Sequence, residues 1–193
     1  MIVVKVGGSL YSTAELAHCL SALANYATQH PIVIVPGGGP FADQVRTAQT
    51  IHLFNDEVAH HMAIIAMKQY GLLLQSHIPT CQTLNTLGSP KAPLSIWLPD
   101  DTLLSEPSLS KSWDISSDSI ALWLANRLDA EQLLLIKRVF INTNSIKELT
   151  SQSIIDQGFK TLFSKRPITT KIIHHQAYDN LSDSIANPSL GLV

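Results

Sequence analysis

Short apolar runs alternate with longer amphipathic segments along this chain. The apolar runs, rich in β-branched and aliphatic residues, predict buried strands at 2–4, 32–35, 94–98, 132–136 and 168–173. Between them, apolar residues recur at steps of three and four and predict helices at 16–27, 41–49, 55–75, 116–128 and 151–164. This alternation of strand and helix predicts an α/β fold, specifically a three-layer α/β/α sandwich around a central, mostly parallel sheet.

Polar residues at the starts of these helices predict their N-caps. Ser12-Thr13-Ala14-Glu15 has the S-x-x-E form of a capping box before the first helix. Asn55 or Asp56 is expected to cap the helix at 55–75, and Ser116 or Ser117 the helix that follows them. Each of these positions combines a short polar side chain with a following helical pattern, which is the usual signal for the beginning of a helix.

Each of the first two strands ends in a glycine-rich turn. Lys5-Val6-Gly7-Gly8-Ser9 closes the first and Pro36-Gly37-Gly38-Gly39-Pro40 the second. Such turns expose backbone N–H groups that bind phosphate, and a lysine adds a mobile positive charge. The alternative is a pair of turns that need glycine only for positive φ or close packing. Neither turn matches the Walker or dinucleotide-binding patterns. Neighbouring parallel strands would bring both turns to the edge of the sheet where α/β proteins bind ligands.

Composition narrows the class of protein. The 193 residues are 45% hydrophobic and 15% charged, which predicts an extensive core, a fairly apolar surface and a homo-oligomer. Because 13 basic residues face 15 acidic ones without a basic run, we expect no nucleic-acid partner. We expect a cytoplasmic protein without membrane segments, since no long apolar stretch occurs and Cys19 and Cys81 have the character of buried thiols.

The organisation of the chain is expected to be simple. No repeat, low-complexity tract or linker divides it, so a single domain over 1–193 is predicted. The serine-rich segment 105–112 predicts a loop near the ligand-binding edge, whereas residues 80–95 predict no regular element.

Three motifs together resemble a known family. The two glycine turns, the second extended by Phe41-Ala42-Asp43, are followed by Trp113-Asp114-Ile115-Ser116-Ser117-Asp118-Ser119-Ile120-Ala121. In this order and at these spacings they resemble the amino acid kinase family of acetylglutamate, uridylate and isopentenyl phosphate kinases, up to about residue 141. The stretches 39–46 and 59–71 look like a small archaeal and methylotroph branch. That branch includes the kinase of methanofuran biosynthesis, which converts an aminomethyl-furanmethanol phosphate to its diphosphate.

The resemblance implies an ATP- and Mg²⁺-dependent kinase acting on a small phosphorylated substrate. It implies that Lys5 contacts the transferring phosphoryl group and that Gly7, Gly8 and Ser9 bind the phosphates of the nucleotide. Gly37, Gly38 and Gly39 would lie on the acceptor side. Backbone donors and lysines aimed at the moving charge would provide most of the catalysis. An acceptor that is itself a phosphate is already ionised, so no general base is required.

For several other candidate residues, a structural role remains an alternative to the functional one. Asp118 matches the aspartate that holds the catalytic lysines in this family, although it could simply cap its helix. Asp43 and Arg46 share a helix face, so Arg46 could either clamp the acceptor's phosphate or form a surface ion pair with Asp43. His60 and its neighbour His61 point in different directions and do not form a metal-chelating pair. One of them, taken here as His60, is expected to face the substrate.

The chain departs from the family pattern at two points. Residues 137–142 replace a Thr-Asp-Val-Asp-Gly loop that helps to bind the nucleotide, although Lys137 keeps a basic residue expected to contact the nucleotide. No Gly-Gly-Met element precedes a second catalytic lysine, and Lys160 is the nearest candidate. These losses leave two alternatives open. The chain could be a weakened nucleotide- or phosphate-binding subunit, or a kinase for another acceptor such as an isoprenoid phosphate or a nucleoside monophosphate.

Overall fold

The computed structural model describes residues 1–85, 90–187 and 191–192, which contain a six-stranded sheet. The strands are β1 (Ile2–Val6), β2 (Ile32–Pro36), β3 (Gln82–Leu84), β4 (Leu94–Trp97), β5 (Gln132–Lys137) and β6 (Thr170–His174). They lie in the order β3-β4-β2-β1-β5-β6, and every neighbouring pair is parallel. The pattern did not predict β3, which lies within 80–95. Residues 86–89 of that segment are outside the described part of the chain.

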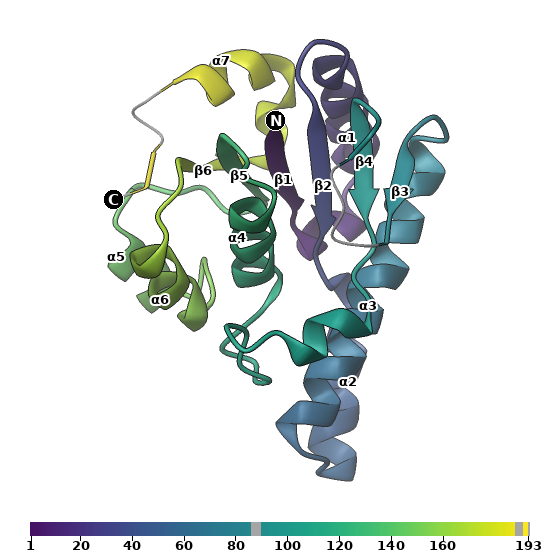
Figure 1. The fold of residues 1–193 in the computed structure, drawn as a ribbon, viewed down its shortest axis with the longest axis vertical. Helices are drawn as coiled ribbons and strands as arrows, with labels where there is room; N and C mark the ends of the chain where they lie inside the picture. Colours follow the sequence, from purple (N-terminus) through teal and green to yellow (C-terminus); the bar gives the residue numbers. More distant parts are fainter. Residues whose placement is uncertain (86–89, 188–190, 193) are drawn as a thin grey trace.

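Helices cover both faces of the sheet, which confirms the predicted α/β/α sandwich (Figure 1). The α-helices are α1 (Glu15–Ala27), α2 (Gly39–His52), α3 (Asp56–His77), α4 (Ser117–Arg127), α5 (Ile146–Ser151), α6 (Gln157–Lys165) and α7 (Leu181–Ala186). Three 3₁₀ helices, η1 (Gly8–Ser12), η2 (Asp101–Ser105) and η3 (His175–Asn180), complete the regular elements of the described residues. Helices α1 and α7 lie on one face, and α4, α5 and α6 on the other.

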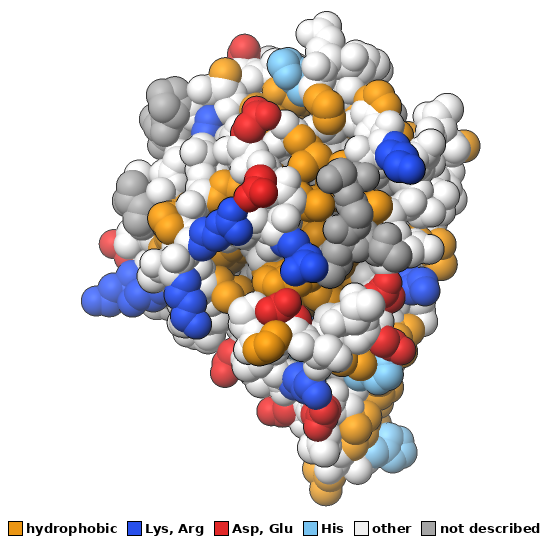
Figure 2. Space-filling model, viewed as in Figure 1, with side chains coloured by type: hydrophobic (Ala, Val, Ile, Leu, Met, Phe, Trp, Pro, Cys, Tyr) orange, Lys and Arg blue, Asp and Glu red, His pale blue; other side chains and the backbone are white. Residues whose placement is uncertain are grey.

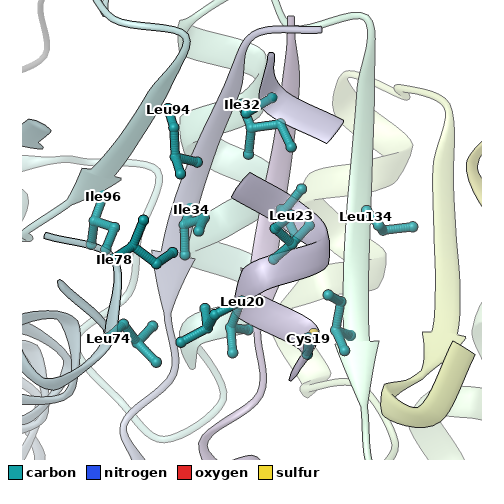
Figure 3. Close-up of a cluster of buried hydrophobic side chains, with 14 of the residues drawn as sticks. Cys19, Leu20, Leu23, Ile32, Ile34, Leu74, Ile78, Leu94, Ile96 and Leu134 are labelled. Atoms are coloured by element: carbon teal, nitrogen blue, oxygen red, sulfur yellow. The ribbon is translucent and has the colours of Figure 1, made fainter. Parts of the chain in front are cut away.

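Alternation along the strands supplies both cores. Val4 and Ile34 point toward α1, where they meet Leu20 and Leu23. Figure 3 shows these α1 side chains over the middle of the sheet, with Leu23 between Ile34 and Leu134. Val3 and its neighbours in β2 and β5 point the other way, toward α4 and α6. Because successive strand residues face opposite sides, a strand buried on both faces is mostly apolar. This is why these strands appear in the sequence as continuous apolar runs.

Helices α2 and α3 form a hairpin that projects beyond the carboxyl ends of the strands (Figure 1). Asn55 caps α3 as predicted, because its side chain accepts a hydrogen bond from the N–H of Val58. Leu53 makes the turn between the helices with a φ of 56°. The hairpin therefore carries its side chains well past the glycine turns.

Two local predictions are wrong. The capping box does not form, because η1 continues the glycine turn as far as Ser12 and leaves Ala14 as the N-cap of α1, with no side-chain cap hydrogen bond. Because α5 ends at Ser151, only the second part of the helix predicted at 151–164 forms, as α6. Ser153 breaks the predicted helix with a φ of 56°, and Asp156 starts α6 by accepting a hydrogen bond from the N–H of Phe159 at 3.0 Å.

Candidate active site

The two glycine turns lie directly against each other at the carboxyl edge of the sheet. Val6 pairs with Pro36, so both strands end at the same level. A Cβ on Gly8 would lie 2.2 Å from the backbone nitrogen of Gly39, and a Cβ on Gly37 would lie 2.5 Å from that of Gly8. Any side chain at Gly8 or Gly37 would therefore push the turns apart. The close contact explains why glycines occur in both turns.

The backbone N–H groups at this edge have two different uses. Gly7 donates to the carbonyl oxygen of Ile136 at 3.1 Å, and Gly37 donates to that of Val6 at 2.9 Å. The sheet therefore uses both groups, and these two glycines supply space rather than donors. The first N–H groups of η1 and α2 have no acceptor within their own helices. The donors available to an anion thus lie at the starts of η1 and α2, which begin at Gly8 and Gly39.

Lys5 and Lys137 reach one carboxylate from neighbouring strands. Strand alternation places both lysines on the α4 side of the sheet, the side that Val3 and Leu135 also face. Asp118, in the first turn of α4, lies between them. Its Oδ1 is 2.8 Å from Lys5 Nζ, an ion pair without hydrogen-bond alignment, and its Oδ2 accepts a hydrogen bond from Lys137 Nζ at 2.5 Å. The N-cap of α4 is Ser116, so the alternative that Asp118 caps its helix does not apply.

The cluster of Lys5, Asp118 and Lys137 is buried and strongly coupled. Burial raises the pKa of Asp118, but the charges of Lys137 and Lys5 outweigh this effect and lower it to about 2. Burial also lowers the pKa of Lys137, and the charge of Lys5 lowers it further against the opposing effect of Asp118. The carboxylate is therefore ionised at neutral pH. It holds two ammonium groups beside the glycine edge.

Asp156 anchors the start of α4 from the neighbouring helix. Its Oδ2 accepts hydrogen bonds from the N–H and hydroxyl of Ser116, at 3.0 and 2.7 Å, and from the N–H of Ser119 at 3.0 Å. Its Oδ1 accepts from the hydroxyl of Ser119 and from the N–H of Phe159. One carboxylate thus fixes α4 to α6 and, through α4, fixes Asp118. Burial raises the pKa of Asp156, and the negative charge of Asp118 adds to the effect.

Two cavities meet at the glycine turns. The α2–α3 cavity, about 380 Å³, is lined mainly by α2, α3 and the segment before α4. The α4–α6 cavity, about 400 Å³, is lined by Lys5, Asp118, Lys137 and Asp156 and by the loop before α6. Both are lined by Gly8, Ser9, Arg46, Trp113, Ser116 and Ser117. Two ligands could therefore occupy separate spaces and still meet at one backbone edge.

Arg46 lies where the two cavities join. Its Nη1 donates to Asp43 Oδ1 at 3.1 Å, and its guanidinium carbon lies 4.1 Å from the centroid of the Trp113 ring. Trp113 is held in turn by a hydrogen bond from its Nε1 to Gln49 at 2.7 Å. The predicted ion pair is present, and the same guanidinium also lines both cavities. Stacking on an indole orients the guanidinium and leaves its edge free for an anion.

The two adjacent histidines have different surroundings. His60 is 4% exposed and lines the α2–α3 cavity, and its Nε2 is buried without a hydrogen-bond partner among the described residues. His61 lies closer to the surface, with its Nε2 3.0 Å from Asp101. Burial lowers the pKa of His60, and the charge of Lys111 lowers it further, against a backbone hydrogen bond with Ser112. The structure thus places His60, and not His61, at the cavity.

The family model for the amino acid kinase family matches residues 1–140. This chain belongs to the amino acid kinase family. It is 31% identical, over 95% of its own length and 92% of the relative's, to the [5-(aminomethyl)furan-3-yl]methyl phosphate kinase of Methanocaldococcus jannaschii. The prediction of a kinase is confirmed, and so is the resemblance to the methanofuran-biosynthesis kinase.

Solved structures support the fold of this amino acid kinase. The uridylate kinase of Archaeoglobus fulgidus matches with a TM-score of 0.72 and 16% identity, covering 96% of this chain and 95% of that one. The UMP kinase of Ureaplasma parvum matches with a TM-score of 0.67 and 13% identity, covering 99% and 96%. At these identities the likeness shows the shared architecture alone.

The structure shows where the two segments that depart from the family pattern lie, the loop after β5 and the region of Lys160. Lys137 stays in the site because it is the last residue of β5, although the loop after it differs. That loop is held by a hydrogen bond between His174 Nε2 and the carbonyl oxygen of Arg138 at 2.9 Å, and Phe140 stacks on His174. Lys160 is exposed on α6 and is not among the residues that line either cavity. Its proposed role therefore has no support from the geometry.

Sequence reasoning missed two residues of this kinase site. Asp156 is the N-cap of α6, but the prediction of one long helix at 151–164 gave this residue no role. Trp113 belongs to the third motif, but nothing in the sequence indicated that it would stack on Arg46. The first could have been found from its capping position. The second depends on a contact between distant segments.

The described residues give little support for other kinds of site. They contain no group of three or more His, Cys, Asp or Glu side chains that could hold a metal ion. None of their helices has the length and apolar character needed to cross a membrane. On the face drawn in Figure 2, basic and acidic side chains are interspersed. The concentration of charge that matters here is the buried cluster of Lys5, Asp118 and Lys137.

Proposed function

We propose that this kinase transfers the γ-phosphoryl group of ATP to the phosphate of [5-(aminomethyl)furan-3-yl]methyl phosphate and forms the diphosphate. The observation that carries the proposal is the meeting of two cavities at one glycine edge, with the cluster of Lys5, Asp118 and Lys137 on one side only. The similarity to the Methanocaldococcus jannaschii enzyme, over 95% of this chain, supports the choice of acceptor.

The α4–α6 cavity is the proposed nucleotide side. Its buried ammonium groups, on Lys5 and Lys137, suit the triphosphate of ATP, and the first N–H groups of η1, at Gly8 and Ser9, would bind the same oxygens. Gly7 contributes by letting the turn pack against β5, where a Cβ would lie 2.8 Å from the carbonyl oxygen of Ile136. Asp118 keeps both lysines in position while the charge moves.

The α2–α3 cavity is the proposed acceptor side. The start of α2, at Gly38 and Gly39, offers backbone donors to the acceptor's phosphate, and Gly37 makes room for them. Arg46 can bind that phosphate at the junction of the cavities, with Asp43 holding the guanidinium in place. His60 lines the same cavity. The apolar walls between these groups suit a small furan ring.

The reaction needs no proton acceptor. An oxygen of the acceptor's phosphate attacks the γ-phosphorus, forming a new P–O bond while the bond between that phosphorus and the β,γ-bridging oxygen of ATP breaks. ADP carries away the electron pair of the broken bond. Lys5 and Lys137 stabilise the oxygens on which charge accumulates, and Asp118 keeps these ammonium groups oriented. Lys160 remains a prediction for a further cation near the leaving group.

A bound Mg²⁺ would neutralise phosphate charge when present. The residues described here do not form a protein cage for it, since Asp118 is paired with two lysines and Asp156 accepts hydrogen bonds from α4 and α6. Mg²⁺ would have to be held mainly by the phosphates of the nucleotide. A homo-oligomer, a single domain over 1–193 and a cytoplasmic location also remain proposals.

An acceptor panel tests this function. The purified protein is incubated with ATP and Mg²⁺ and one of three acceptors: the furan phosphate, an isoprenoid phosphate or uridine monophosphate. ADP release and product mass are measured. We expect ADP release coupled to formation of the furan diphosphate only. Transfer to another acceptor would replace the substrate assignment. ATP binding without transfer to any acceptor would favour the binding-subunit alternative.

A further inference from the structure

The buried ring of His60 lies far from the glycine edge. Tyr70, ten residues further along the same helix, packs close to Gly39 and donates to the carbonyl oxygen of Gly7 at 3.5 Å. At 1.5 Å per residue, the Cα atoms of His60 and Tyr70 lie about 15 Å apart along the axis of α3. His60 and the two glycine turns nevertheless line the same α2–α3 cavity. His60 therefore faces the end of an acceptor that is remote from its phosphate.

The hydrogen bonding of His60 defines what it can bind. A hydrogen bond between the His60 ring and the backbone of Ser112 raises the pKa of the ring. Because a bond that favours the protonated ring is one that the ring donates, its acceptor is the carbonyl oxygen of Ser112. Because Nε2 has no partner among the described residues, the donor is Nδ1. In the neutral ring Nε2 then carries a lone pair and acts only as an acceptor. A buried acceptor of this kind calls for a ligand that donates.

The charges around the ring keep it neutral. Lys111 and His61 both disfavour the imidazolium form, and burial disfavours it more strongly. Lys111 is itself paired with Glu57, so its positive charge is partly compensated. A neutral ring cannot contribute a charge to bind phosphate. It can accept a hydrogen bond from a cation.

Resting on the proposed function, we propose that Nε2 of His60 accepts a hydrogen bond from the aminomethyl group of the acceptor and makes the enzyme selective for an amine-bearing phosphate. The phosphate then lies at the glycine edge and the ammonium lies toward the projecting end of the α2–α3 hairpin. His60 determines specificity and does not touch the reacting atoms. An acceptor without a donor at that end leaves the buried lone pair unpaired.

Two acceptors and three variants test this assignment. The acceptors are the aminomethyl furan phosphate and an analogue in which a methyl group replaces the aminomethyl group. We expect the unmodified enzyme to favour the amine in kcat/KM by about ten- to hundredfold, as for a hydrogen bond to a charged group. His60→Leu should abolish this preference by lowering kcat/KM for the amine alone. His60→Gln, which retains an acceptor oxygen, should restore part of it, and the matched control His61→Leu should keep it in full.

The outcomes separate this inference from the proposed function. Equal loss with both acceptors in His60→Leu, or an unchanged preference, would overturn the role of His60 and leave the kinase assignment intact. Failure of the unmodified enzyme to phosphorylate either furan, with transfer to another phosphate, would overturn both. If His60→Leu does not fold, ¹⁵N NMR of the unmodified protein decides. The amine, unlike the methyl analogue, should shift an unprotonated Nε2 resonance, and a protonated Nε2 would contradict the proposal.

Discussion

The two cavities share one glycine edge but are built in opposite ways. The α4–α6 cavity concentrates charge, and its buried carboxylates have partners from several elements. The α2–α3 cavity is lined mostly by apolar side chains, and the Nε2 of His60 has no partner among the described residues. The difference teaches that groups acting on a constant chemistry are fixed by the protein itself. In the proposed function, specificity depends instead on a few polar atoms in a largely apolar wall.

The comparison predicts that the charged side is the more sensitive to substitution. Asp118→Asn removes the charge that holds Lys5 and Lys137. We expect kcat to fall about a hundredfold or more with either acceptor, the effect of losing one preorganised charge. Steady-state ADP release measures it. The matched control is Asp129→Asn, whose exposed carboxylate pairs with Arg166 on the surface. A decrease of less than tenfold would contradict the central role of Asp118.

The shared edge offers a way to disturb both cavities at once. A methyl group in Gly8→Ala would meet the backbone nitrogen of Gly39 at 2.2 Å and separate the turns. Since a displacement of about 1 Å can cost about a hundredfold in rate, we expect a loss of up to that size in kcat/KM for both substrates. Initial-rate measurements with each substrate varied in turn provide the check. A defect confined to one substrate would show that the cavities do not share this edge.

The pH dependence tests the charged side alone. Burial and the charge of Lys5 lower the pKa of Lys137 to about 8. Lys137 is a cation below that pH and neutral above it, so kcat/KM for ATP should fall as the pH rises through about 8. At pH 9 the loss should be about tenfold, because one protonated lysine in about ten remains. Lys137→Arg should remove this decline, since a guanidinium stays protonated. A flat profile for the unmodified enzyme would count against Lys137 binding the nucleotide as a cation.

The smallest effect on rate is expected from substitution of Asp156, which fixes α4 to α6 next to the charged cavity. Asp156→Asn leaves one oxygen to accept the hydrogen bonds that come from α4 and α6. We expect a loss of stability of about 1–3 kcal/mol, measured by urea unfolding. We also expect a decrease in kcat smaller than that of Asp118→Asn, with little change in KM for the acceptor. A change in acceptor KM without a change in stability would contradict a purely supporting role.

Strong local patterns made much of the fold predictable. The apolar runs predicted five of the six strands in the described residues, because strands buried on both faces consist mostly of apolar residues. The short β3 was missed, since Gln82 and Thr83 are exposed in this edge strand and give no apolar signal. The capping box failed for another reason. Ser12, the first residue of the expected box, belongs to η1 instead, so α1 starts after Ala14 without a side-chain cap.

The sequence by itself determined the alternation of the five main strands with helices, the glycine turns and the lysine before the first turn, because each depends on neighbouring residues. Only the tertiary structure decided that Lys5, Asp118 and Lys137 form one cluster, that Arg46 stacks on Trp113 and that His60 lies at the far end of a cavity. Those contacts join segments far apart in the chain. Their geometry follows from the register of the sheet and the packing of helices on it, which no local pattern contains.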